Sequence, residues 1–314
     1  MIEVPAPTAR VPVAGRAGWW LPAAALFLVA VSPARAADLV LDAATGPYVD
    51  ALVNGVPLRL RVDFDHGRSL TLNPDAAARA GLGNGEGSWI QIIGPVRLRG
   101  RSTEMPVTLA GQTTRAKVNW QEVAVAADAD GVVTPYLLPF DRVTLERRPA
   151  VGGEREMVFE SRIHWNHGIH VPVRIGKRRI AARLSFHHPR TTAPAAAAAV
   201  IIEAQGGALE GARSHEEIGF GVKRPARPLR LERPLRIGDL AITRLMARSA
   251  DYRGKHKLAL PGAPVKDSEI LVTGQRPSQD ALYRITLGLD VLERCSAASY
   301  VRATGEIRLR CAAP

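Results

Sequence analysis

The sequence predicts an all-β protein built from two β-barrel lobes with short helices, and two observations lead to this prediction. Runs of alternating apolar and polar residues recur along the chain, for example over 56–64, 96–99 and 229–237. Glycine, proline, asparagine or aspartate breaks the pattern about every ten residues, which is the spacing of strands joined by turns. Helical patterns are confined to short stretches at 74–80 and 195–204. The second observation is an internal repeat, which predicts that the chain contains two similar lobes.

The first 36 residues have the features of a signal peptide. Arg10 and Arg16 precede an apolar run over 19–31, and residues 34–36 offer small side chains for cleavage. The apolar run is shorter than the roughly 20 residues that cross a bilayer, which argues against an anchor helix. We therefore expect a periplasmic or secreted protein from which residues 1–36 are removed.

The chain is strongly basic, with a formal net charge of +12. The signal segment contains three arginines and one glutamate, so the mature chain keeps a charge of +10. A basic chain often binds nucleic acid, but export and the scattered arginines argue against that partner. Anionic lipid head groups or lipopolysaccharide are the more natural counter-charge, and a solvated cationic surface is the simpler alternative.

The two cysteines both lie in the last segment of the chain. Cys295 and Cys311 flank two strand-like runs that a turn near residue 303 connects. A hairpin there places the cysteines opposite each other, and an oxidising compartment permits the bond. We expect a disulfide across this hairpin.

An internal repeat appears when the chain is shifted against itself by 122 residues. The shift superposes two alternating apolar series, Leu58, Leu60, Val62 and Phe64 on Ile180, Ala182, Leu184 and Phe186. It then places residues 65–69 on 187–191, and a later segment, 132–138, matches 286–292. We expect a first lobe over 37–160 and a second lobe over 161–314.

The repeated segments carry a resemblance to a known family. Asn54-Gly55-Val56-Pro57 through Val62, then Asp65-His66-Gly67-Arg68-Ser69 and Leu70 to Leu82, resembles the opening of bacterial retropepsin-like aspartic proteases. In that family a strand ends in Asp-Thr/Ser-Gly-Ala-Ser and is followed by a strand and a short helix. Leu287-Gly288-Leu289-Asp290 resembles the apolar-apolar-Gly motif that closes such a lobe. The resemblance implies two retropepsin-like barrels related by a pseudo-twofold axis and an aspartic endopeptidase ancestry.

The family's chemistry needs two carboxylates about 3 Å apart that share one proton. By resemblance, Asp65 is the catalytic aspartate of the first lobe and Gly67 permits its tight loop. The second lobe has His187 in the position of the aspartate and Pro189 in that of the glycine. The catalytic pair is therefore broken within one chain.

Other positions of the resemblance also depart from the family pattern. His66 and His188 replace the small hydroxyl residue that bonds across to the opposite lobe, and Thr134 replaces the closing glycine of the first lobe. The resemblance places the following residues in the cleft between the lobes: His66, Gly67, Ser69, His188 and Gly288.

Two further aspartates have simpler interpretations. Asp63 precedes Asp65 by two residues, and we expect it to be a solvated strand residue rather than a second catalytic acid. Asp290 follows Gly288, and we expect it to cap the start of a helix.

The eight histidines raise the question of a metal. His164, His167 and His170 alternate between faces if they lie on a strand, which does not gather three ligands. His66, His187 and His188 would meet Asp65 in one cleft, and such a set is acceptable transition-metal chemistry. Since no spacing typical of a zinc site occurs, we expect no metal site and no cofactor.

The segment 267–276 is similar to a sequence near the mature amino terminus of TonB-dependent outer-membrane receptors. It is either a surface insertion or a segment that engages an envelope transport partner by strand addition.

Three functions remain. The residues favour a pseudo-protease that binds a peptide or an envelope partner without cleavage. The first alternative is an active aspartic endopeptidase in which a homodimer brings two Asp65 residues together. The second is a structural envelope protein that uses its cationic surface.

Overall fold

The computed structural model describes residues 38–93, 96–164, 167–248 and 283–313. Strands hold 56% of these described residues and helices 10%, which confirms the all-β expectation. The expected signal segment 1–36 and the segment 267–276 lie outside the described residues. Among those described, no helix has the length and apolar character needed to cross a membrane.

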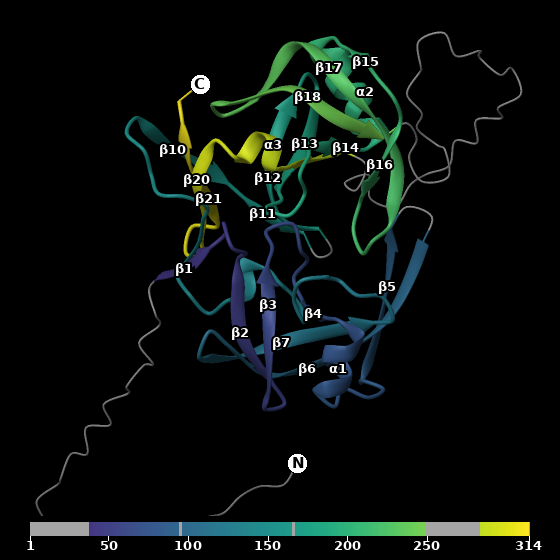
Figure 1. Cartoon of the computed structure of the whole chain (residues 1–314), viewed down its shortest axis with the longest axis vertical. Helices are drawn as coiled ribbons and strands as arrows, with labels where there is room; N and C mark the ends of the chain where they lie inside the picture. Colours follow the sequence, from purple (N-terminus) through teal and green to yellow (C-terminus); the bar gives the residue numbers. More distant parts are fainter. Residues whose placement is uncertain (1–37, 94–95, 165–166, 249–282, 314) are drawn as a thin grey trace, which may run out of the picture. The chain divides into compact units, whose positions relative to one another are not determined.

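Seven strands from the first half of the chain form the first sheet (Figure 1). Their order is β2-β3-β8-β4-β7-β6-β5, and a further pairing of β2 with β6 closes six of them into a barrel. The elements of this half are β2 (Tyr48–Val53), β3 (Val56–Val62), β4 (Leu70–Leu72), α1 (Pro74–Arg79), β5 (Gly87–Ile93), β6 (Val96–Leu109), β7 (Gln112–Gln121), β8 (Gly131–Val133) and the 3-10 turn η1 (Pro135–Leu137).

The hairpin of β2 and β3 follows from local sequence. Asn54 and Gly55 have φ of +51° and +76°, a left-handed pair that a two-residue hairpin turn requires and that asparagine and glycine adopt readily. Leu58, Leu60 and Val62 alternate along β3 and are at most 3% exposed. These side chains of β3 therefore point into the barrel. The residues that follow Val62, beginning with Asp63, leave the barrel at the end of this strand.

The second half of the chain forms a nine-stranded second sheet. The order is β11-β12-β13-β19-β14-β18-β17-β15, with β16 also paired to β17. The elements are β11 (Arg162–His164), β12 (Gly168–Ile175), β13 (Arg178–Leu184), β14 (Thr192–Ala193), α2 (Ala195–Gln205), β15 (Ala208–Leu209), β16 (Ser214–Glu217), β17 (Lys223–Ile237), β18 (Leu240–Arg248), β19 (Arg284–Leu287) and α3 (Leu289–Leu292).

The pairings of the second sheet follow the same order as those of the first. The run β2-β3-β8-β4-β7-β6 corresponds to β12-β13-β19-β14-β18-β17, and each pair is parallel or antiparallel in both runs alike. The register also agrees, since Val62 pairs with Val133 and Leu184 with Leu287. The β2–β6 closure has no counterpart among the described strands of the second sheet. The pseudo-twofold relation stays a prediction.

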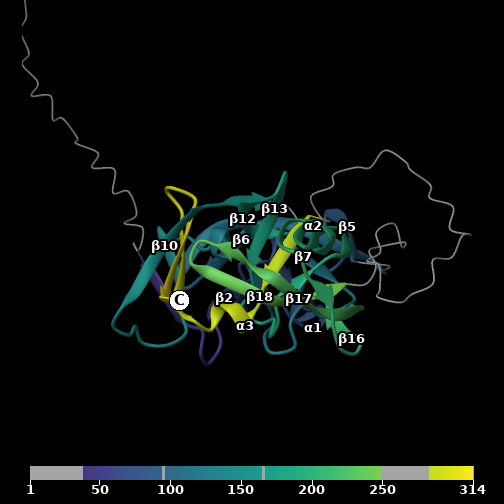
Figure 2. The ribbon, with the colours of Figure 1, turned by 90° about the horizontal axis from the view of Figure 1, so that it is seen from above.

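A third sheet joins the two halves of the chain. Its order is β1 (Asp38–Asp42), β9 (Arg142–Glu146), β20 (Cys295–Val301), β21 (Glu306–Ala312) and β10 (Glu154–Glu160). The β20–β21 hairpin lies beside β10 in both views (Figure 1 and Figure 2). One face of this sheet is buried along the row Leu41, Leu145, Ala298, Leu309 and Met157. The expected segments 37–160 and 161–314 therefore share a sheet, and the boundary near residue 160 stays a prediction.

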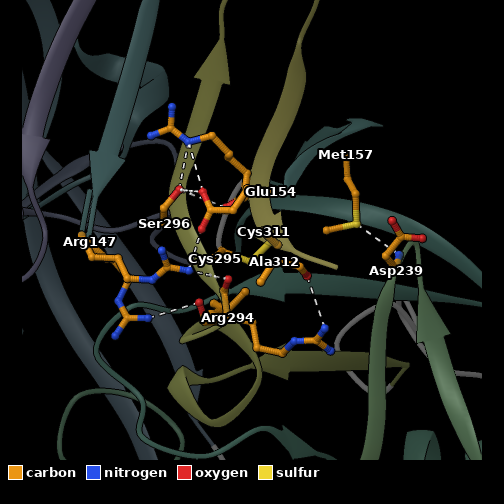
Figure 3. Close-up of a disulfide and its surroundings, with 12 residues drawn as sticks. Arg147, Glu154, Met157, Asp239, Arg294, Cys295, Ser296, Cys311 and Ala312 are labelled. Atoms are coloured by element: carbon orange, nitrogen blue, oxygen red, sulfur yellow. Dashed lines mark hydrogen bonds and ion pairs between the residues drawn. A yellow bond between two sulfur atoms is a disulfide. The ribbon is translucent and has the colours of Figure 1, made fainter. Parts of the chain in front are cut away.

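The expected disulfide is present in the third sheet. Cys295 and Cys311 are paired residues of β20 and β21, and their sulfurs are bonded (Figure 3). Beside the bond, Ser296 donates a hydrogen bond to Glu154 on β10 at 2.6 Å. The disulfide therefore joins the two strands of the hairpin at its open end, and the Ser296–Glu154 contact links the hairpin to β10.

We expect the disulfide to stabilise the protein through the terminal hairpin. A cross-link over 16 residues lowers the entropy of the unfolded chain by an amount worth about 3 kcal/mol. Denaturant unfolding of the oxidised protein, compared with the Cys295→Ala/Cys311→Ala variant, measures this difference. Reductant should destabilise the natural chain and leave the double variant unchanged. An unchanged midpoint for the natural chain would contradict the prediction.

Candidate functional site

Two loops that follow equivalent strands form the candidate site. The first loop, residues 63–66, begins where β3 ends, and the second loop, residues 185–188, begins where β13 ends. The first N–H of each loop donates a 2.9 Å hydrogen bond to the parallel strand beside it, β8 for the first loop and β19 for the second. Both loops are therefore fixed at the same point of their sheets.

Aromatic rings bring the two loops into direct contact. Phe64 and Phe186, which the repeat places at equivalent positions, lie with their ring centroids 5.9 Å apart in an edge-on arrangement. The N–H of Ile169 on β12 donates to the Phe64 carbonyl at 2.8 Å. A Cβ on Gly168 would lie 2.4 Å from that carbonyl, and Gly168 has φ of +72°. Only glycine fits here, because any side chain would separate β12 from the first loop.

Asp63 lies at the centre of this contact. Its side chain is 4% exposed, and its Oδ1 lies 3.2 Å from Nδ1 of His187 in the second loop. Its Oδ2 accepts a hydrogen bond from Arg61 Nε at 3.0 Å. Arg61 also donates to Asp128 Oδ1 at 2.7 Å. The expectation that Asp63 is a solvated strand residue is wrong, because cationic partners hold both of its oxygens inside the protein.

The charges of this pair reinforce each other. Burial disfavours the charged form of His187, but the carboxylates of Asp63 and Asp65 outweigh burial and raise the pKa of His187 to about 9. Burial likewise opposes ionisation of Asp63, but His187 and Arg61 lower the pKa of Asp63 below its ordinary value. At neutral pH the two side chains therefore form an ion pair.

Asp65 faces the next residue of the second loop. Its Oδ2 lies 3.7 Å from Nδ1 of His188, and the same nitrogen lies 2.7 Å from the Ser185 hydroxyl. That hydroxyl is also 3.2 Å from Nδ1 of His187. Burial lowers the pKa of His188. One potential ligand atom from each of Asp65, His187 and His188 falls in a cluster whose members lie within 4.8 Å of one another.

The other predicted residues in and just after the first loop, His66, Gly67 and Ser69, belong to the surroundings of the first sheet. The ring of His66 does not take part in the cluster of Asp65, His187 and His188, and its Nε2 lies 2.9 Å from the Thr71 hydroxyl on β4. Burial lowers the pKa of His66. Gly67 is buried, and the Ser69 hydroxyl accepts a hydrogen bond from Asn119 at 2.8 Å.

Gly288 and Asp290 contact the residues that directly follow the second loop. A Cβ on Gly288 would lie 2.4 Å from the Arg190 carbonyl carbon, so glycine lets the backbones approach. Asp290 accepts hydrogen bonds from the Thr191 N–H at 2.8 Å and from the Thr191 hydroxyl at 2.7 Å. The expectation that Asp290 caps α3 is wrong. Gly288 is the N-cap residue of this helix, and the Asp290 carboxylate bonds to Thr191 instead.

The three spaced histidines lie in the β11–β12 region. His164 and His167 stack with ring centroids 4.6 Å apart, although alternation along one strand predicted that they separate. They meet because β11 and β12 form an antiparallel hairpin rather than one strand. His167 Nδ1 lies 3.0 Å from Arg284, and burial together with Arg284 lowers the pKa of His167. The described residues give no metal-type cluster at these histidines.

Sequence reasoning missed three residues of the site: Arg61, Asp63 and Ser185. The signal was present, because Arg61 and Asp63 are two residues apart and share a face of the strand. Ser185 is the repeat counterpart of Asp63, so the repeat also pointed to it.

The arrangement restricts the chemistry that the loops can perform. Asp63 and Asp65 belong to the same loop, and Asp63 is fully engaged by His187 and Arg61, so no shared-proton carboxylate pair exists among the described residues. A Ser-His-Asp relay needs the two ring nitrogens to contact different partners, but Ser185 and Asp65 both face Nδ1 of His188.

Comparison with models of known families and with curated proteins finds no match to this chain.

The ion pair of Asp63 and His187 predicts a pH dependence of stability. His187 has an ordinary pKa near 6.5 and a folded pKa of about 9, so its contribution is complete below pH 6.5 and is lost as the pH rises through 9. Because the ring is 30% exposed, we expect a loss of about 1–2 kcal/mol between pH 6.5 and 9.5.

Denaturant unfolding at a series of pH values measures this loss. The His187→Gln variant should lack it, and His215→Gln, a matched change at an exposed histidine, should keep it. An equal loss in the natural chain and the His187→Gln variant would show that another group titrates.

Proposed function

We propose that this protein is an exported, non-hydrolytic homologue of the retropepsin-like aspartic proteases, which binds a peptide or an envelope partner at the two loops. The observation that carries the proposal is the partner of Asp65. The second loop offers imidazoles where an aspartic protease needs a carboxylate. The proposal includes a periplasmic or secreted location, which the disulfide supports because such bonds persist in oxidising compartments.

The strand pairings support descent from a two-lobed protease. Both runs place their loop at the end of the second strand of a hairpin, beside a parallel strand. Phe64 contacts Phe186, its own counterpart in the repeat. Self-counterpart contacts arise when two copies face each other about a twofold axis.

The missing acid removes the protease reaction. Aspartic proteases use one carboxylate to activate water and a second, protonated carboxyl to donate a proton to the peptide carbonyl. Asp63, the other acid of the site, has a lowered pKa and both of its oxygens are occupied. It remains ionised and does not supply that proton.

The alternative of an active homodimer meets a steric obstacle. Two Asp65 carboxylates from different chains must come within about 3 Å to share a proton. His188 of the same chain already faces Asp65, and both side chains are at most 15% exposed. A second chain would have to displace the His187–His188 loop, together with its contact between Phe64 and Phe186.

The site keeps a group suited to binding a peptide. His187 is charged and its ring is 30% exposed, so it offers a hydrogen-bond donor to a carbonyl or carboxylate group. Charge-assisted hydrogen bonds of this kind are about twice as strong as neutral ones. The predicted ligand is therefore a peptide that presents an acceptor to His187.

Peptides selected by display on the immobilised natural chain test the proposal. They should bind with an affinity that falls by about tenfold in His187→Ala, since a charged hydrogen bond contributes roughly 1.5 kcal/mol or more. The matched variant His215→Ala should bind normally. The selected peptides should also remain intact from pH 3 to 7, as followed by mass spectrometry.

Cleavage that pepstatin inhibits and Asp65→Asn abolishes would overturn the proposal and establish an aspartic endopeptidase. Binding that is insensitive to His187→Ala would move the binding surface away from the two loops.

A further inference from the structure

The contacts between the two loops also bring together three side chains that can bind a metal, Asp65, His187 and His188. Two imidazoles adjacent in sequence converge on one carboxylate from a loop more than a hundred residues away. The rings of His187 and His188 lie with centroids 4.2 Å apart, and Ser185 contacts both. Packing two imidazoles against each other beside a carboxylate concentrates three donor atoms in one place.

We propose that Asp65, His187 and His188 form a binding site for a divalent transition metal of the zinc class. Two imidazole nitrogens and one carboxylate oxygen are a ligand set that zinc accepts, whereas magnesium and calcium prefer oxygen ligands alone. Three protein ligands leave a fourth position of a tetrahedral ion open to water or to a group of a bound peptide.

The geometry is close to that of a formed site. Metal–ligand distances of about 2.1 Å place the ligand atoms of a tetrahedral site roughly 3.4 Å apart. The cluster has its ligand atoms within 4.8 Å of one another, so closure by somewhat more than 1 Å completes it. Closing the site requires the rings of His187 and His188 to turn, so the contacts of their Nδ1 atoms with Asp63 and Ser185 change when the metal binds.

The backbone that carries the ligands is already fixed. The contact of Phe64 with Phe186 holds the loops together, and the hydrogen bond from Ile169 to the Phe64 carbonyl anchors the first loop. Side chains on a rigid backbone lose little entropy when a metal binds.

The surroundings supply supporting contacts and negative charge. The Ser185 hydroxyl lies within hydrogen-bonding distance of Nδ1 of both rings and holds their orientation in the metal-free protein. Asp63 adds a second carboxylate beside His187, and the nearby cation Arg61 is shared between Asp63 and Asp128. The carboxylates of Asp63 and Asp65 stand against the nearby cations Arg61 and Arg183, and a metal that binds His187 displaces the proton that its ring carries at neutral pH.

This inference concerns the loops of the proposed function but requires neither peptide binding nor the absence of proteolysis. Both cysteines are consumed by the disulfide, so no thiolate competes for the metal. The rival histidine group is the stacked pair His164 and His167. The two sites are separable by substitution.

Isothermal titration of the chelator-treated, full-length mature protein with zinc chloride tests the site. We expect one equivalent to bind with a dissociation constant below about 10 µM, and magnesium chloride to give no signal. Asp65→Asn and His188→Ala should each weaken zinc binding by about tenfold or more. His167→Ala and the exposed control His215→Ala should bind as the natural chain does.

Cobalt chloride gives a second readout, because cobalt in a tetrahedral site absorbs visible light intensely. We expect these absorption bands to reach their full intensity at one equivalent of cobalt. Circular dichroism shows whether each variant is folded. The proposal would be overturned if the natural chain showed no saturable binding up to about 1 mM zinc. It would also be overturned if His167→Ala removed the binding and His188→Ala did not.

Discussion

The contact between the first loop and the second loop is the constraint on which the arrangement of the site depends. Asp63 would be costly to bury alone, since an unpaired carboxylate inside a protein is strongly destabilised. His187 crosses from the other half of the chain to compensate it, and Arg61 completes the compensation from the same strand. Phe64 and Phe186 add an apolar contact beside the charges. The charge of Asp63 is therefore compensated while the two loops are in contact, and the third sheet, with strands from both halves, joins the parts of the chain that carry them.

Under the descent from aspartic proteases that we propose, the same contact explains how the two facing loops persist without the protease reaction. Two aspartates in facing loops repel unless they share a proton, and this enforced sharing is the source of the catalytic acid and base. In this protein a histidine, His187, faces the carboxylates of the first loop, and its pKa rises to about 9 beside Asp63 and Asp65, so the two loops attract each other. In the proposed descent, this histidine stabilises the loop contact and takes the place of the proton donor. Its imidazole nitrogens, with those of His188, are the chemical basis of the proposed metal site.

Much of the fold follows from the sequence, and the parts that do not have specific physical causes. Alternation along residues 58–64 and the cysteine spacing led to β3 and to the disulfide, because both depend on neighbours in sequence. The burial of Asp63 depends on His187, which is 124 residues away, so local periodicity gave it no partner. Asp290 was taken for a cap because helix starts favour aspartate, whereas its actual partner, Thr191, lies 99 residues away. The stacking of His164 on His167 required knowledge of the β11–β12 hairpin.

A double-mutant cycle on Asp63 and His187 tests the central claim most directly. Unfolding free energies of the natural chain, Asp63→Asn, His187→Gln and the double variant give the coupling between the two side chains without assigning a value to either alone. The account predicts a favourable coupling of about 1–3 kcal/mol at pH 7, as for a hydrogen bond between charged groups at a largely buried site. Effects of the two single changes that add to within about 0.3 kcal/mol would show that the residues do not interact, and would contradict the proposed contact between the loops.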